Sequence, residues 1–237
     1  MKYFLSISLL FLLFSPCYGQ KKTPDYSYII TSKKVVMRHH NETAVLTIPV
    51  ASAKYPALRK ALRDTCLFFG DSLEDVINDY QLEGSGITSL SYELTFVNKN
   101  IISLKLYYET MGAYPSESQR WLTLNIHTGQ HYALKNEIIP KGLNWVLTKY
   151  KTILRKRISG NREDKDCSDT YNDLKTAIDN LNSNALFKGY LFTKDGIMVS
   201  MEPTLPHVVQ SCESARDVMV PYIKLKPFKT SEAIVIK

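Results

Sequence analysis

Two neighbouring segments of the chain alternate between apolar and polar residues, and this pattern constrains the fold more than any other feature. In TSLSYELTFV, residues 88–97, and in ISLKLYY, residues 102–108, apolar side chains recur at every second position. A period of two is typical of a β-strand with one buried face. The polar residues 98–100 between the segments are suited to a turn, so we predict an antiparallel hairpin.

The segment MGAYP, residues 111–115, interrupts the strand pattern. Glycine permits tight backbone turning, and proline cannot continue the hydrogen-bond ladder of a strand. We therefore expect a corner at Gly112–Pro115, followed by another strand. Thr128 and Gly129 then predict a hairpin turn, which opposes Ile126 to His131 if the turn has two residues and places His127 in the loop if it has three.

Helical segments are marked by apolar residues that recur every three or four positions. Ser72 and Asp75 resemble a capping box that opens a short helix, and Ser168 is a candidate cap for a later one. The three apolar stripes are Leu58, Leu62, Cys66 and Phe69; Leu143, Val146, Leu147, Tyr150, Ile153, Leu154 and Ile158; and Tyr171, Leu174, Ile178 and Leu181.

The last part of the chain again favours strands. Asp195-Gly196 is typical of a type I′ hairpin turn, and DVMVPYIKL, residues 217–225, reads as a strand in which Pro221 indicates an edge or a bulge. Runs of strands and runs of helices predict an α+β fold with mainly antiparallel sheets and packed helices. We expect two adjoining subdomains, at residues 28–118 and 119–228.

The N-terminal residues 1–19 have one positive charge followed by an apolar run from Phe4 to Phe14. This run is too short to span a bilayer and is typical of a signal peptide, so we expect an exported protein without a transmembrane segment in the mature chain. A lipoprotein anchored at Cys17 is the weaker alternative, because Pro16 directly before it fits that signal poorly.

Three cysteines remain after residue 19, and disulfides persist in exported proteins. Cys66 lies on an apolar helix stripe, where a buried free thiol is the simpler interpretation. Cys167 and Cys212 both lie in polar loops, and we predict that they form a disulfide. No two cysteines are close in sequence, so they do not indicate a metal site.

The positive charge is concentrated between residues 141 and 165. Eight basic residues against two acidic ones give this segment +6, whereas the whole chain has +7. A face that includes Lys149, Arg155 and Lys156 could contact an anionic envelope polymer, lipid head groups or an acidic protein. The simpler alternative is a solvated helix face. Nucleic acid is not expected, because no nucleic-acid-binding motif occurs.

The search for catalytic motifs yields little. EGSGI, residues 83–87, lacks the Gly-x-Ser-x-Gly spacing of a nucleophile elbow. The adjacent His39 and His40 would point to opposite faces if they lie in a strand, and in a turn they are more often exposed than bound to a metal. The two sides of a hairpin turn would separate His127 from His131, so we predict no metal site and no cofactor. Glu109 and Glu117 flank the Gly112–Pro115 corner, and paired carboxylates can act as acid and base in glycoside hydrolysis.

Two stretches resemble the RsiV-like domain family in the order and spacing of their motifs. They are IISLKLYYETMGAYPSESQRWLTLNIHTGQHYALKNEIIP, residues 101–140, and the segment that runs from LFTKDGIMVSMEP to VPYIKLKPF, residues 191–228. The resemblance covers about residues 28–228. It implies an exported envelope module, because members occur alone, joined to polysaccharide deacetylases, and as the outer part of a lysozyme-binding anti-sigma factor.

The chain departs from the family pattern at Met111, Tyr114, Asn125 and Gln130, which stand where Gly, His, Asp and Lys are usual. Without the corner histidine, acid–base chemistry at this point is disfavoured. We therefore expect a non-catalytic module that binds an envelope polymer or a lysozyme-like protein, and a cell-wall glycan hydrolase is the alternative. The candidate binding residues are Glu109, Tyr114, Glu117, Arg120, Lys149, Arg155 and Lys156.

Overall fold

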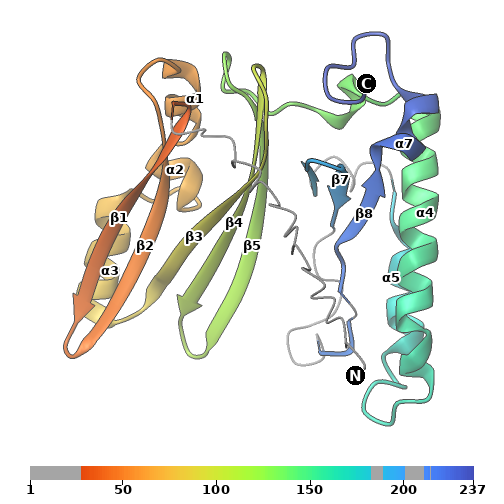
Figure 1. Ribbon diagram of the computed structural model, residues 1–237. Coiled ribbons are helices and arrows are strands. Elements are labelled where there is room, and N and C mark those ends of the chain that lie inside the picture. The colour runs from red at the N-terminus through yellow and green to blue at the C-terminus, as the bar shows by residue number, and fades with distance from the viewer. Residues whose placement is uncertain (1–27, 183–188, 201–210, 214) are drawn as a thin grey trace, which may run out of the picture.

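The computed structural model describes residues 28–182, 189–200, 211–213 and 215–237. The predicted signal peptide, Cys17 and the loop at residues 203–210 lie outside these ranges. Within them the chain forms a mixed five-stranded sheet, a three-stranded antiparallel sheet and flanking helices, which confirms the α+β class (Figure 1).

The five-stranded sheet has its strands in sequence order. Neighbouring strands are antiparallel except β2 and β3, which form a short parallel pair. A parallel pair needs a crossover connection, and three helices between β2 and β3 supply it. The strands are β1 (Ile30–His39), β2 (Glu42–Ala51), β3 (Gly86–Val97), β4 (Ile101–Met111) and β5 (Pro115–Asn125).

The crossover helices pack on one face of this sheet and bury a first apolar core. The predicted capping box is confirmed, because Ser72 and Asp75 exchange hydrogen bonds at the start of α3. The Ser72 hydroxyl is also the main reason that the pKa of the Asp75 carboxyl lies below its ordinary value. The helices are α1 (Pro56–Ala61), α2 (Asp64–Leu67) and α3 (Leu73–Glu83).

The single helix expected from Leu58 to Phe69 is wrong. The chain turns at Leu62 and Arg63, which separates α1 from α2. The rotation after the turn buries Leu67 and Phe68 completely, whereas Phe69 has a left-handed φ of 60° and is 62% exposed. The apolar content of the segment was interpreted correctly, but the turn changed which side chains face the core.

The other part of the chain builds a second apolar core around a long helix. The three-stranded sheet has the order β6-β7-β8, so β8 is an edge strand, as Pro221 predicted. Its helices run along the outside (Figure 1). The elements are α4 (Pro140–Ile158), α5 (Tyr171–Asn180), β6 (Tyr190–Phe192), β7 (Gly196–Val199), β8 (Val218–Pro221) and α7 (Tyr222–Leu225), with 3-10 turns at Leu134–Asn136, Ser159–Arg162 and Lys226–Phe228.

Three local predictions in this part need correction. The helix α5 begins after Thr170 and not at a Ser168 cap. Gly196 lies in β7, paired with Pro221, so it is not in the turn itself. The strand expected over residues 217–225 ends at Pro221, because Tyr222 begins α7 and its hydroxyl donates to the Thr193 carbonyl at 2.8 Å.

The two sheets are joined by hydrogen bonds across their facing surfaces. The Thr95 hydroxyl donates to the Phe192 carbonyl at 2.8 Å, and the Phe192 N–H donates to the Ser103 hydroxyl at 3.3 Å. Ser103 is also within 3.0 Å of the Thr123 hydroxyl. Because both faces of the sheet are covered here, Ile101, Ile102, Ser103 and Leu104 of β4 are all buried. The expected boundary at residues 118/119 lies within β5, and the division into subdomains stays a prediction.

Candidate functional site

The Gly112–Pro115 corner is the tip of the β4–β5 hairpin. The Gly112 N–H points to the Tyr114 carbonyl at 3.4 Å, and the Tyr114 side chain is 81% exposed. Gly112 has open space around it, since a β-carbon built there has no neighbour within 4 Å. The corner is therefore a projecting turn, with its aromatic ring in solvent.

Glu109 and Glu117 are directly opposite each other in the β4–β5 ladder. Directly opposed residues share one face of a sheet, so the two carboxylates are neighbours, and like charges in this position destabilise a hairpin slightly. Both side chains are exposed. Together with Tyr114 they form an acidic and aromatic hairpin end, which we call the hairpin tip.

Arg120 lies on β5 but faces the opposite side of the sheet. Its guanidinium donates to the Cys66 carbonyl and lies 5.7 Å from the centre of the Phe69 ring. Cys66 is a free thiol, as predicted, but it is half-buried and not fully buried. Arg120 therefore holds the α2 region against the sheet, and the structure does not bring it together with the hairpin tip.

The hydroxyl of Tyr108, next to this arginine, is buried and donates to the Leu67 carbonyl at 2.8 Å. Burial raises the pKa of Tyr108 to about 12, and the positive charge of Arg120 partly offsets that rise. This tyrosine remains protonated at physiological pH, so it acts as a hydrogen-bond donor in the core.

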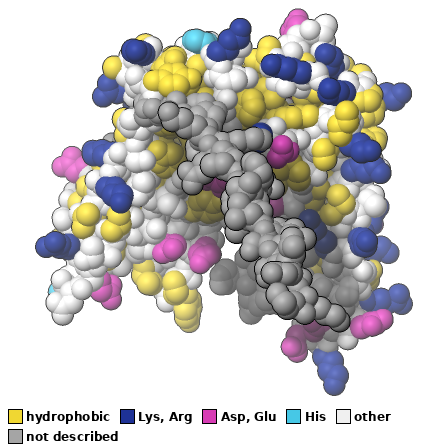
Figure 2. Space-filling view, in the orientation of Figure 1, with side chains coloured by type: hydrophobic (Ala, Val, Ile, Leu, Met, Phe, Trp, Pro, Cys, Tyr) yellow, Lys and Arg dark blue, Asp and Glu magenta, His cyan; other side chains and the backbone are white. Residues whose placement is uncertain are grey.

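The predicted basic helix is α4, which carries six lysines and arginines and no acidic residue. Lys and Arg side chains follow the edge of the molecule where α4 lies (Figures 1 and 2). Several of these cations have partners within the protein. Arg155 forms an ion pair of 2.6 Å with Asp179 of α5, and Lys151 donates to the Asp179 carbonyl at 2.7 Å.

Lys149 and Lys156 occupy the outward face of α4, about one and three turns beyond the half-buried Trp145. The Lys149 ammonium lies 5.8 Å from the centre of the Trp145 ring, and that ring packs against Phe228 at 5.5 Å. We call the residues Lys141, Trp145, Lys149 and Lys156 the α4 stripe. Of the predicted cations, Lys149 and Lys156 belong to it, whereas Arg155 points toward α5.

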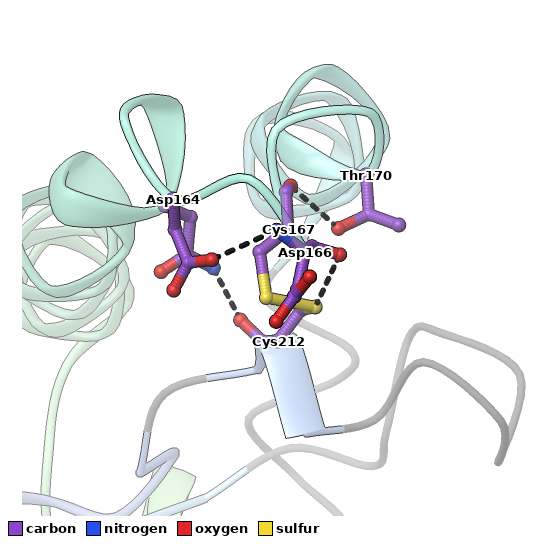
Figure 3. Close-up of a disulfide and its surroundings, with 6 residues drawn as sticks. Asp164, Asp166, Cys167, Thr170 and Cys212 are labelled. Carbon is purple, nitrogen blue, oxygen red and sulfur yellow. Dashed lines mark hydrogen bonds between the residues drawn. A yellow bond between two sulfur atoms is a disulfide. The ribbon is translucent and has the colours of Figure 1, made fainter.

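The predicted disulfide is confirmed, because Cys167 and Cys212 are bonded (Figure 3). It ties the turn before α5 to the segment that leads to β8. The Thr170 hydroxyl donates to the Cys167 carbonyl at 2.9 Å, and the Asn161 amide donates to the Cys212 carbonyl. A disulfide of this kind is typical of proteins that fold in an oxidising compartment.

The histidines do not form a common site. His39 and His40 lie with ring centres 4.2 Å apart at the β1–β2 turn, where His40 has a φ of 50° and is exposed, as expected for a turn. His127 bonds to the Lys99 carbonyl, whereas His131 lies beside Tyr190. Among the described residues, no group of three or more His, Cys, Asp or Glu is placed to hold a metal ion.

The largest feature missed from the sequence is Glu137. Its side chain is fully buried, and its carboxylate accepts hydrogen bonds from the Tyr132 hydroxyl at 2.7 Å and from the backbone N–H groups of Ile234, Val235 and Ile236. The three backbone partners are nearly 100 residues away in sequence, so only the folded chain reveals them. Glu137 anchors the C-terminal segment and does not face solvent.

Within the described part of the chain, no helix is both long and apolar enough to cross a membrane. A scan against protein-family models found no match, and a search of curated protein sequences found none at the significance required.

Comparison with solved structures shows which fold the chain has. A DUF3298 family protein from Pseudomonas aeruginosa PAO1 superposes with a TM-score of 0.53 at 11% identity, over 86% of this chain and 94% of that one. A DUF3298 family member from Bacteroides fragilis NCTC 9343 gives a TM-score of 0.51 at 11% identity, over 87% of this chain and 94% of that one. The chain therefore shares the fold of these two DUF3298 proteins along most of its length, and the RsiV-like resemblance stays a prediction.

Proposed function

We propose that the protein is an exported, non-catalytic module that binds an anionic glycan of the cell envelope along the α4 stripe. The observation that carries this proposal is the sequence of outward-facing groups on α4, in which Lys141, Lys149 and Lys156 flank Trp145 without any acidic residue on the helix. Lysine ammonium groups attract carboxylates or phosphates of a polymer. An exposed part of an indole ring can pack against the C–H face of a sugar.

The shape of this surface also suits a polymer. A 19-residue helix is about 28 Å long, so successive charged units of an extended chain can contact successive turns. The ion pair of Arg155 with Asp179 leaves that cation less available, and we assign it to holding α5 in place.

Binding of alginate, an acidic polysaccharide, provides the test. The double variant Lys149→Gln/Lys156→Gln should lose most of the affinity measured by calorimetry at low salt, and neutral dextran should not bind either protein. The matched control is Lys34→Gln/Arg38→Gln on β1, which removes the same charge elsewhere. Equal losses in both double variants would mean that net charge alone governs binding, and absence of alginate binding would remove the proposal.

A second candidate is the recognition of a basic protein such as lysozyme by the hairpin tip. The specific observation is that Glu109 and Glu117 are adjacent and exposed behind the projecting Tyr114. Opposite charge on a partner would favour this contact, although the net charge of +7 on the whole chain opposes long-range attraction. Lysozyme should bind the native protein and fail to bind Glu109→Gln/Glu117→Gln if this candidate is right.

The glycan hydrolase alternative has less support. Glu109 and Glu117 lie on an open, solvent-exposed strand pair, whereas carboxylates that cleave glycosides flank a bound sugar within a cleft. The hydrolase alternative would be supported if the native protein cleaves cell-wall glycans and the variant Glu117→Gln does not.

A further inference from the structure

A hollow of about 650 Å³ lies far from both the hairpin tip and the α4 stripe, between α1 and the adjoining ends of β1 and β2. These elements occupy the side of the molecule opposite α4 (Figure 1). The hollow is open to solvent on one side and has a concave surface of mixed character. Neither the sequence motifs nor the family resemblance pointed to it.

Four cations line the hollow, and no acidic residue does among the side chains that the structure describes. Arg59 and Lys60 come from the last turn of α1, Arg63 from the link to α2, and Lys33 from β1. All four side chains are exposed, and none forms an ion pair with another described residue. This contrasts with α4, where Arg155 and Lys151 are held by Asp179.

Three separate elements therefore direct positive charge toward one concave surface. Like charges repel one another, and none of the described residues that line the hollow supplies a carboxylate to compensate. An anion bound between the four side chains would relieve that repulsion.

The floor of the hollow is apolar, and Ile48 and Leu62 in it are buried with 4% and 6% exposure. The described side chains of this floor offer no carboxylate to compete for the guanidinium groups. It also lowers the local dielectric constant, which strengthens each contact between a cation and a bound anion.

We propose that this hollow is a binding site for a phosphate group, carried by a phosphorylated small molecule or by a phospholipid head group. A phosphate monoester, such as glycerol 3-phosphate or the head group of phosphatidic acid, carries almost two negative charges and three acceptor oxygens, which match several converging donors better than a single carboxylate does. Arginine provides paired N–H donors in the geometry of phosphate oxygens, and two arginines are present.

This site is independent of the proposed glycan binding. The α4 stripe is convex and suits an extended polymer, whereas the hollow is concave and suits one compact group. Its occupation by phosphate would therefore not require the α4 stripe to be intact.

The experiment uses the whole mature chain and follows backbone amide NMR shifts and calorimetric heat. Inorganic phosphate and glycerol 3-phosphate are the soluble probes, with acetate at the same ionic strength for comparison. Vesicles of phosphatidic acid in phosphatidylcholine, and of phosphatidylcholine alone, form the lipid arm. Shifts concentrated at Lys33, Arg59, Lys60 and Arg63 with phosphate, and weaker ones with acetate, are the expected result.

The variant Lys60→Gln/Arg63→Gln should weaken phosphate binding by about tenfold or more, because each of its two substitutions removes a charge-assisted contact with the phosphate. Lys34→Gln is the matched control. Lys34 follows Lys33 on β1 but points to the other face of the strand, so it should change the affinity by less than about twofold. Circular dichroism verifies that the variants are folded.

Binding to phosphatidic acid vesicles but to neither soluble probe would identify a lipid head group as the source. Saturable binding of the soluble probes would identify a phosphorylated small molecule. The proposal is overturned if no phosphate compound binds, if acetate binds equally well, or if Lys60→Gln/Arg63→Gln binds like the native chain. Intact phosphate binding in Lys149→Gln/Lys156→Gln would show that this site stands even if the glycan proposal fails.

Discussion

The carboxylate of Glu137 accepts hydrogen bonds from the backbone N–H of Val235 at 3.0 and 3.1 Å, although 98 positions separate the two residues. The N–H groups of Ile234 and Ile236 point at the same carboxylate. A buried charge is costly unless it is fully hydrogen-bonded, and these three successive donors together with the Tyr132 hydroxyl satisfy it. One side chain thereby fixes the C-terminal segment to the start of the second core.

Replacement of Glu137 by glutamine should destabilise the protein. Glutamine has one acceptor oxygen, and its amide nitrogen would face backbone donors, so at least one N–H would lose its partner. We expect a loss of about 3 kcal/mol in the free energy of unfolding, measured in urea. The exposed Glu232→Gln should change it little, and equal stability of the two variants would contradict the anchoring role.

Removal of the disulfide should also destabilise the fold. The bond closes a loop with a sequence separation of 45, for which the chain-entropy relation gives about 4 kcal/mol. The double variant Cys167→Ser/Cys212→Ser should therefore unfold at a lower denaturant concentration than the native protein. Cys66→Ser serves as control, since Cys66 is free. If the double variant keeps the native midpoint, the bond contributes nothing to stability.

Gly196 is required because another backbone approaches it closely. A β-carbon at this position would lie 2.3 Å from the Val220 carbonyl oxygen in β8. Gly196→Ala should therefore separate β7 from β8 and cost about 1 to 3 kcal/mol in unfolding experiments. Gly112→Ala at the hairpin tip, where no atom lies within 4 Å, should be tolerated. The measurement is the denaturation midpoint of each variant. A midpoint of Gly196→Ala that is as high as that of Gly112→Ala would contradict the prediction.

Stability should depend on pH through His131. Partial burial of the ring lowers the pKa of His131 below its ordinary value of 6.5. The unfolded chain then binds a proton more readily than the folded one, so protonation favours unfolding. The contribution of neutral His131 to the free energy of unfolding is therefore fully present above pH 6.5 and is lost as the pH falls through the lower pKa of the folded state.

His131→Gln should reduce this pH dependence. Urea unfolding curves at about pH 7.5 and about pH 5 provide the measurement. The exposed His40→Gln, in the β1–β2 turn, should leave the difference between the two conditions as it is in the native protein. If the stability of His131→Gln still differs between the two pH values as much as that of the native protein, the pH dependence arises from other groups.

Local patterns predicted much of the fold because their causes are local. Strand alternation located β3 and β4, and the Ser72–Asp75 pair located the start of α3. Two polar-loop cysteines indicated the disulfide. Each of these rests on the geometry of a few consecutive residues or on the chemistry of the compartment.

The candidate site could be predicted only in part. The sequence placed Glu109, Tyr114 and Glu117 near one corner, and the hairpin brings them together because adjacent strands share a turn. Nothing in the sequence indicated that Arg120 would turn inward to Cys66 or that Arg155 would pair with Asp179. Those partners come from other elements, whose positions depend on packing.

The sequence by itself determined the α+β class, the succession of most strands and helices, and the cysteine pair, since short-range periodicity and turn chemistry act within a few residues. Only the tertiary structure decided that the helix at residues 56–69 divides, that Glu137 holds the C-terminal segment, and that Lys33 joins Arg59, Lys60 and Arg63 around one hollow. These outcomes depend on contacts between residues distant in sequence, and burial of the two apolar cores sets those contacts.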